Sequence, residues 1–177
     1  MTNINFNPFP VLTTESLTLR KPSTDDQRDV LALRSDPEIN KYLGRQPSKT
    51  IEDAINFINK VNDNIEKNNS IYWVITFTKT KEFVGTICLF DFSKEKNSCE
   101  IGYELMAKFQ GQGIMKEATK KVIDYAFQTM QFQKIVAFTH NDNQNSTKLL
   151  EKFDFKKSIG ADKENSDLNL FTLTNSN

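Results

Sequence analysis

Apolar and polar residues follow two different periods in the first part of the chain. Residues 16–20, Ser-Leu-Thr-Leu-Arg, alternate strictly between polar and apolar, which predicts a half-buried strand. A short helix with cap candidates at residues 23–26 is expected to end near Pro37, because the residue before a proline disfavours helical geometry. Between residues 48 and 67, apolar residues recur at steps of three and four, which predicts an amphipathic helix.

Three apolar runs rich in β-branched and aromatic residues come next, at residues 71–77, 83–90 and 99–105. This composition is typical of strands. Polar segments at residues 79–82 and 93–98 separate the runs. We therefore expect consecutive strands joined by turns in an antiparallel group.

The period changes to helical spacing after Gly113 and returns to a short buried strand at residues 134–139. A strand, a helix and a strand in this order predict a βαβ unit over residues 99–139. Its two strands should be parallel and its crossover right-handed.

A further helix is expected at residues 143–153, followed by closing strands at residues 155–159 and 167–173. The chain shows no internal repeat and no break in composition, so we expect one domain over residues 1–177. Residues 1–15 are polar and contain two prolines, which predicts a loosely attached N-terminal arm.

Composition excludes several classes of function. Lys and Arg together number 23, as do Asp and Glu, so the chain lacks the net positive charge of many nucleic-acid-binding proteins. No stretch approaches the roughly 20 apolar residues of a membrane span, and the N-terminus has no signal-peptide pattern. The two cysteines, Cys88 and Cys99, form no CxxC pair, so neither a disulfide framework nor a metal site is expected. We expect a cytoplasmic protein with no metal and no nucleic-acid or membrane partner.

The segment between the third strand of the antiparallel group and the next helix has the pattern of an anion site. Gly111 and Gly113 lie there, and glycine lets a backbone approach a ligand closely. The first turn of a helix presents unpaired N–H groups and a positive dipole end, which suit a phosphate, and Lys116 would add charge. A plain turn into a helix would also explain the two glycines. The patterns GxxxxGK[ST] and GxGxxG are both absent.

This segment resembles motif A of the GCN5-related N-acetyltransferases, written Q/R-x-x-G-x-G/A. Gln110, Gly113 and Met115 occupy its three fixed positions. Met115 stands where Gly or Ala is usual, so its side chain must point away from a bound pyrophosphate.

Four further blocks resemble, in the expected order, the subfamily that includes the ribosomal-protein N-terminal acetyltransferases. They lie at residues 9–20, 36–43, 100–105 and 143–155, and in the last of them Asp154 replaces the usual Gly. The resemblance implies an α/β (α+β) fold with a mixed, mostly antiparallel central sheet flanked by helices. Its fourth and fifth strands are parallel and splay apart, and the acyl carrier lies in the gap.

The resemblance also implies acetyl-CoA as cosubstrate. Its pyrophosphate is expected on the backbone of Gln110, Gly111, Gln112, Gly113, Ile114, Met115 and Lys116. Backbone groups of Leu105 and Met106 are expected to pair with the pantetheine like a strand edge. Asn143 is expected to cap its helix and also to touch the pantetheine arm.

Acyl transfer to an amine needs a base for the amine and benefits from an acid for the departing thiolate. The resemblance implies Glu100 as the base, acting directly or through water, unless it is a solvated or salt-bridged strand residue. Glu104 lies on the same strand face and competes for the role. Ser146 matches a serine near the carrier's sulfur, although a serine at a helix start also bonds its own backbone. Tyr103 is expected as a core or cleft-wall ring, and His140 has no partner evident from sequence.

No residue is marked as a covalent nucleophile. The resemblance therefore implies direct attack in a ternary complex by a primary amine, either a protein N-terminus or a small molecule, on acetyl-CoA. One alternative is a non-catalytic CoA-binding or regulatory module on the same fold. Another is an acyltransferase for a longer acyl group or for another acceptor, such as an aminoglycoside. Both a monomer and a homodimer are compatible with the sequence.

Overall fold

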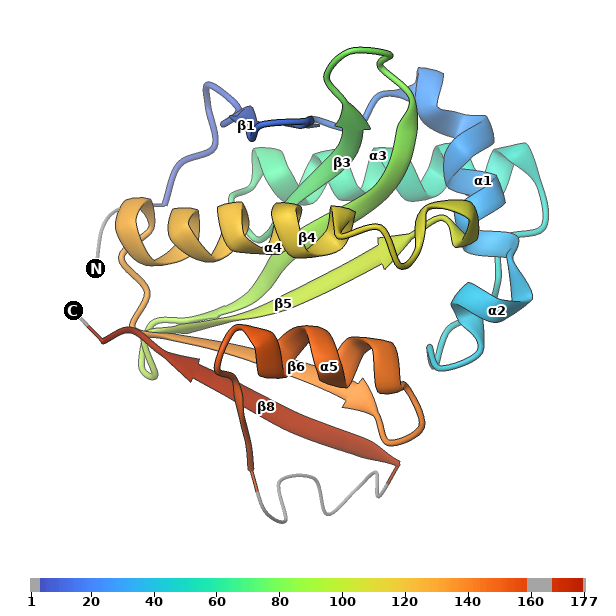
Figure 1. The fold of residues 1–177 in the computed structure, drawn as a ribbon. Coiled ribbons are helices and arrows are strands. Elements are labelled where there is room, and N and C mark those ends of the chain that lie inside the picture. The colour runs from blue at the N-terminus through green and yellow to red at the C-terminus, as the bar shows by residue number, and fades with distance from the viewer. Residues whose placement is uncertain (1–3, 159–166, 177) are drawn as a thin grey trace.

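The computed structural model describes residues 4–158 and 167–176. One mixed sheet of eight strands, in the order β1-β2-β3-β4-β5-β6-β8-β7, carries helices on both faces (Figure 1). The strands are β1 (Leu12–Thr13), β2 (Leu17–Arg20), β3 (Ile71–Phe77), β4 (Phe83–Ser93), β5 (Ser98–Leu105), β6 (Lys134–His140), β7 (Lys156–Lys157) and β8 (Leu168–Thr174). The α-helices are α1 (Gln27–Ser35), α2 (Pro37–Asn40), α3 (Ile51–Glu66), α4 (Ile114–Asp124) and α5 (Gln144–Lys152). The predicted mixed, mostly antiparallel architecture is confirmed.

The predicted antiparallel group is present as β2 to β5, each strand paired with the next. β4 is longer than predicted, because its pairing with β5 continues past an irregularity in register between Phe90 and Ser93. Ser93 and Ser98 face each other there, so the polar connection shrinks to residues 94–97. Of the predicted closing strands, the first is only two residues long, and Ile159 lies outside the described residues.

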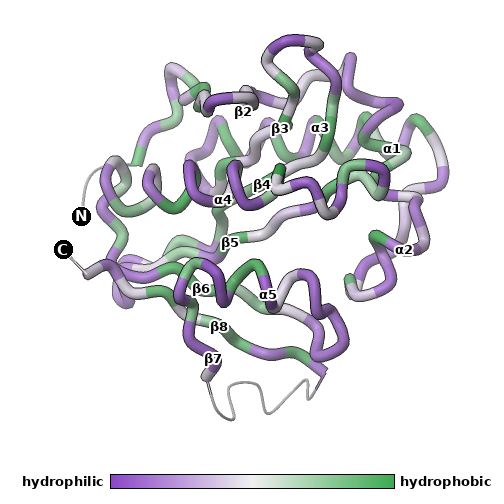
Figure 2. The backbone as a smooth tube through the Cα atoms, viewed as in Figure 1, coloured by the Kyte–Doolittle hydropathy of each residue, from purple (hydrophilic) through white to green (hydrophobic). Residues whose placement is uncertain are grey.

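The amphipathic pattern places α3 against the sheet. Its buried residues are Ala54, Ile58, Val61 and Ile65. Figure 2 shows hydrophobic and hydrophilic residues alternating in the same way along α4 and α5. The apolar faces of these helices therefore supply the two layers that cover the sheet.

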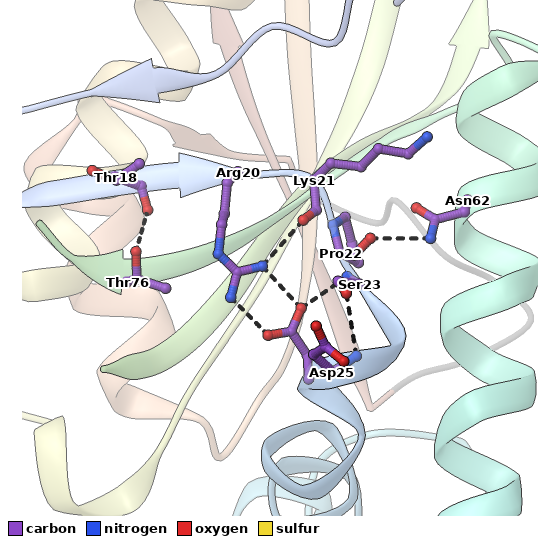
Figure 3. Close-up of polar contacts among 9 residues, drawn as sticks. Thr18, Arg20, Lys21, Pro22, Ser23, Asp25, Asn62 and Thr76 are labelled. Carbon is purple, nitrogen blue, oxygen red and sulfur yellow. Dashed lines mark hydrogen bonds and ion pairs between the residues drawn. The ribbon is translucent and has the colours of Figure 1, made fainter. Parts of the chain in front are cut away.

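The start of α1 is tied to β2 by an ion pair. The Arg20 guanidinium binds the Asp26 carboxylate at 2.7 Å, and the same carboxylate accepts a hydrogen bond from the Ser23 N–H at 2.8 Å. Figure 3 shows Arg20 directed at this turn, with the Asn62 amide of α3 donating to the Pro22 carbonyl at 3.1 Å. The predicted cap at residues 23–26 is thus confirmed, and it joins β2, α1 and α3.

The expectation of a loosely attached N-terminal arm is corrected for residues 6–13. Phe6 is 4% exposed, and its N–H donates to the Asn68 side-chain oxygen at 2.8 Å. The buried Trp73 indole N–H donates to the Pro10 carbonyl at 2.8 Å, and β1 pairs with β2. A buried indole needs an acceptor for its N–H, and here the arm supplies it.

The predicted βαβ unit is present, with β5 and β6 parallel. Their pairing covers only residues 98–100 and 134–136. Beyond that point β5 stays with β4 as far as Leu105, while β6 stays with β8 as far as His140. The two parallel strands therefore diverge, as the family resemblance implies.

Asp154 occupies the left-handed residue at the end of α5, with φ of 63°. The Asp154 N–H donates to the Glu151 carbonyl, and the Phe155 N–H donates to the Leu150 carbonyl. This pair of hydrogen bonds is the Schellman arrangement, in which glycine is favoured because a left-handed backbone strains other residues. The turn is preserved although Asp replaces the usual glycine.

We expect Asp154→Gly to stabilise the protein by roughly 1 kcal/mol, because it relieves the left-handed strain without removing a core contact. Urea denaturation followed by circular dichroism measures the free energy of unfolding. Asp154→Ala is the matched control and should be destabilising, since alanine keeps the strain and lacks a polar side chain to stabilise the turn. A Gly variant less stable than the wild type would contradict this account.

Candidate active site

A cleft of about 260 Å³ opens where β5 and β6 diverge. It is lined by residues 101–103 of β5, residues 137–140 of β6, residues 42–44 after α2, and by Asn143, Ser146 and Leu168. Elements from both faces of the sheet therefore contribute to a single gap.

The backbone of β5 turns an unpaired edge toward this cleft. Successive residues of an antiparallel strand direct their N–H and C=O groups to opposite sides. The Met106 N–H donates to the Val84 carbonyl of β4 at 2.9 Å, so the groups of Tyr103 and Leu105 point toward β6. The Leu105 carbonyl also accepts a hydrogen bond from the Gln110 side-chain amide at 3.2 Å.

The expectation for Met106 is corrected by the same geometry. Its N–H is bonded to β4, and its carbonyl accepts from the Phe109 N–H at 2.9 Å. Both backbone groups already have partners within the chain. Leu105 alone of the two presents its backbone to the open edge.

The segment between β5 and α4 adopts a backbone that requires its glycines. Gly111 has φ of 76° and Gly113 has φ of 78°, and a Cβ added at either would meet nothing within 4 Å. Gly113 is the N-cap of α4 and supplies no side-chain hydrogen bond to the first turn. The N–H groups of that turn therefore lie beside open space, at the positive end of the helix dipole.

The side chains of this segment have three different surroundings: some are buried in the core, one donates a hydrogen bond within the segment, and a lysine is exposed to solvent. Ile114 and Met115 are buried in the main core, which fits the expectation that Met115 turns away from an anion. The side chain of Gln112 donates to the Lys108 carbonyl at 3.0 Å. Lys116 is exposed and lines, with Gly113, Lys120 and Lys121 among others, a second hollow of about 390 Å³.

The first turn of α4 is anchored by the turn before β2. The Glu117 carboxylate accepts hydrogen bonds from the Ser16 N–H at 2.9 Å, from the Ser16 hydroxyl at 2.8 Å and from the Thr14 hydroxyl at 2.5 Å. These contacts join residues about a hundred positions apart. They fix the direction in which the amides at the helix start point.

Ser146 and Tyr103 meet across the cleft. Their hydroxyl oxygens are 2.7 Å apart, and the Ser146 N–H donates to the capping Asn143 side chain at 3.2 Å. Burial raises the pKa of Tyr103 to about 12, although its hydrogen bond with Ser146 opposes the rise. The phenol is therefore protonated at neutral pH and available as a donor. The capping role of Asn143 is confirmed, and Tyr103 is a cleft-wall ring with a polar contact that no sequence pattern indicates.

The two candidate carboxylates of β5 have different surroundings. Glu104 is ion-paired with Arg45, which follows α2 and also donates to the Asn40 side chain at 2.8 Å. Burial, with a smaller contribution from the charge of Asp91, raises the pKa of Glu100 from 4.5 to about 7. A carboxylate with a pKa near neutrality can accept a proton at physiological pH, whereas an ion-paired one is held by its partner.

His140 has a neighbour that the sequence does not indicate. Its ring centroid lies 5.2 Å from that of Tyr42, and its Nδ1 accepts from the Asp142 N–H at 3.1 Å. Both rings line the cleft.

Burial raises the pKa values of the Cys88 and Cys99 thiols to about 12, so neither is poised as a thiolate nucleophile.

Within residues 4–158 and 167–176, no group of three or more His, Cys, Asp or Glu side chains is placed to hold a metal ion. None of the helices in these ranges is both long enough and apolar enough to span a bilayer.

The diverging parallel strands and the glycine-led helix start are the arrangement that the resemblance to the N-acetyltransferases implies. The family model described as "Acetyltransferase (GNAT) domain" matches residues 16–156. The uncharacterized N-acetyltransferase YoaA of Bacillus subtilis is 32% identical over 149 residues, which cover 84% of this chain and 84% of that protein. The chain therefore belongs to the GNAT family of N-acetyltransferases.

Two solved structures show the same fold. Ribosomal-protein-S5-alanine acetyltransferase from Vibrio fischeri aligns with a TM-score of 0.76 and 20% identity, over 94% of this chain and 97% of that one. Spermidine N-acetyltransferase from Vibrio cholerae, solved in complex with CoA and spermine, aligns with a TM-score of 0.78 and 20% identity, over 91% and 96% of the respective chains.

Proposed function

We propose that this protein transfers the acetyl group of acetyl-CoA to a primary amine by direct attack in a ternary complex. The observation that carries the proposal is the open edge of β5 beside the glycine-led start of α4. A diphosphate fits the amides of residues 111–116. An extended pantetheine fits the edge of β5, where the backbone groups of Tyr103 and the N–H of Leu105 face the cleft, while the Leu105 carbonyl accepts from the Gln110 side chain. The structure with CoA and spermine supports the same ligand class here.

Glu100 is the proposed base. Its side chain lies on the sheet face opposite that of Tyr103, because neighbouring strand residues alternate. It removes a proton from the acceptor ammonium, directly or through water, and the freed lone pair forms the new C–N bond at the thioester carbonyl. Glu104 is less suited to the role, since its charge is already paired with Arg45.

Ser146 is the proposed donor to the departing sulfur. When the C–S bond breaks, the electron pair stays on sulfur and the Ser146 hydroxyl donates a hydrogen bond to the thiolate. The proton still carried by the attacking nitrogen passes to this thiolate, directly or through water, so that the products are the neutral amide and CoA with a free thiol. Tyr103 is proposed as a positioning residue, because its hydroxyl lies 2.7 Å from that of Ser146. Positioning of the two substrates supplies the rest of the rate enhancement.

The function is tested by measuring thiol release from acetyl-CoA with a panel of primary amines, including short peptides with free N-termini. We expect thiol release to depend on the amine and the acetylated amine to be detectable by mass spectrometry. Calorimetric binding of acetyl-CoA without turnover across the panel would contradict the proposal. That result would favour the non-catalytic CoA-binding module.

A further inference from the structure

Part of the wall of the cleft is formed by apolar side chains. Among the described residues that line the cleft, none is Asp, Glu, Lys or Arg. Leu43 is 38% exposed and Phe138 is 41% exposed, and both contribute to the lining. Large apolar side chains left open beside a proposed reaction centre indicate a contact surface for a ligand.

Phe138 lies on the same sheet face as Glu100. Val136 stands opposite Glu100 in the parallel pair, and side chains alternate along β6, so Phe138 shares the face of Val136. The intervening Ala137 and Thr139 are buried on the other face. Phe138 therefore lies on the same face as the proposed base, two residues beyond its partner Val136, and on the opposite face from the proposed carrier site.

Neither of the two carboxylates of β5, Glu100 and Glu104, is placed to receive a second cation. Glu104 is ion-paired with Arg45, so its charge is neutralised within the chain. Glu100 is assigned to the reacting amine itself. A polycation would leave its further ammonium groups against apolar side chains, where an unpaired charge is costly.

We propose that the acceptor is a primary amine on an apolar aliphatic or aromatic substituent, with no second cationic group, and that Leu43 and Phe138 contact this substituent. The inference rests on the proposed acetyl transfer and adds the chemical class of the acceptor. The acceptor class follows from two features that meet at one site. One is the exposed apolar pair Leu43 and Phe138, and the other is that the lining residues within 4–158 and 167–176 include no Asp, Glu, Lys or Arg.

The acceptor class is tested by comparing kcat/KM for 2-phenylethylamine and for spermidine at saturating acetyl-CoA. We expect 2-phenylethylamine to be favoured by about tenfold or more, because burial of its ring against Leu43 and Phe138 is favourable and spermidine gains no ion pair. Phe138→Ser should raise the KM for 2-phenylethylamine roughly tenfold and leave acetyl-CoA binding by calorimetry unchanged.

Val11→Ser is the matched control, because Val11 is 56% exposed and lies beside the edge strand β1, whereas the cleft lies between β5 and β6. It should leave both amines' kinetics unchanged. A preference for spermidine, or an unchanged KM in Phe138→Ser, would overturn the acceptor class while leaving acetyl transfer intact. Bound acetyl-CoA with no turnover of any amine would instead refute the acetyl transfer, and the acceptor class with it.

Discussion

Gly113→Glu is expected to abolish the rise in melting temperature that acetyl-CoA produces in the wild-type protein. A ligand that binds only the folded state, at 100 times its Kd, stabilises that state by about 2.7 kcal/mol. For a chain of this size the corresponding shift is roughly 5–10 °C. The glutamate places bulk and negative charge in the open space beside the first turn of α4, where the diphosphate is proposed to bind.

Backbone strain and charge are separated by a second substitution at the same position. Gly113 has φ of 78°, so Gly113→Ala and Gly113→Glu should lower the melting temperature of the free protein by similar amounts. The alanine adds one methyl group that meets no atom within 4 Å, so this variant should keep most of the ligand-induced shift. Differential scanning fluorimetry with and without acetyl-CoA measures both effects. If acetyl-CoA raised the melting temperature of Gly113→Glu as much as that of the wild type, the proposed anion site would be contradicted.

Glu100→Gln is expected to lower kcat/KM by about 10²–10⁴ at pH 8, the range typical of losing a general base. The pKa of Glu100 is raised to about 7, so wild-type activity should increase with pH through that value as the base loses its proton. A glutamine side chain does not titrate in this range, so the activity of Glu100→Gln should not rise with pH near 7. Acetyl-CoA binding should be unchanged, because Glu100 lies on the other face of β5 from the proposed carrier site.

The stability of the same variant shows whether the loss of activity reflects unfolding. Because the pKa of Glu100 is higher in the folded state than its ordinary 4.5, the folded protein holds this proton where the unfolded chain has lost it. Between about pH 4.5 and 7 this group therefore makes folding less favourable as pH rises, and Glu100→Gln should remove that cost. We expect the variant to be at least as stable as the wild type above pH 7. If Glu104→Gln, and not Glu100→Gln, removed the rise in activity with pH near 7, Glu104 would be the base.

Local patterning was sufficient for most elements of the fold. The strict alternation at residues 16–20 and the three-and-four spacing of α3 each describe one face of a single element, which is why β2 and α3 could be predicted. The glycines at 111 and 113 could be placed at a helix start because strand and helix periods change there. The N-terminal arm could not be predicted, because its attachment depends on Trp73 and Asn68, more than sixty residues away.

The arrangement of the proposed catalytic side chains depends on contacts between segments that are distant in the chain. Tyr103 and Ser146 are 43 positions apart, and Glu104 is paired with Arg45 from the other half of the fold. Which of Leu105 and Met106 faces the cleft depends on the register between β4 and β5. Periodicity reports which face of an element is buried, but not which partner it meets. Element types and the glycine-containing turn before α4 could therefore be predicted from the sequence. The pairing of Ser146, the ion pair of Glu104 and the gathering of apolar residues in the cleft required the packed sheet.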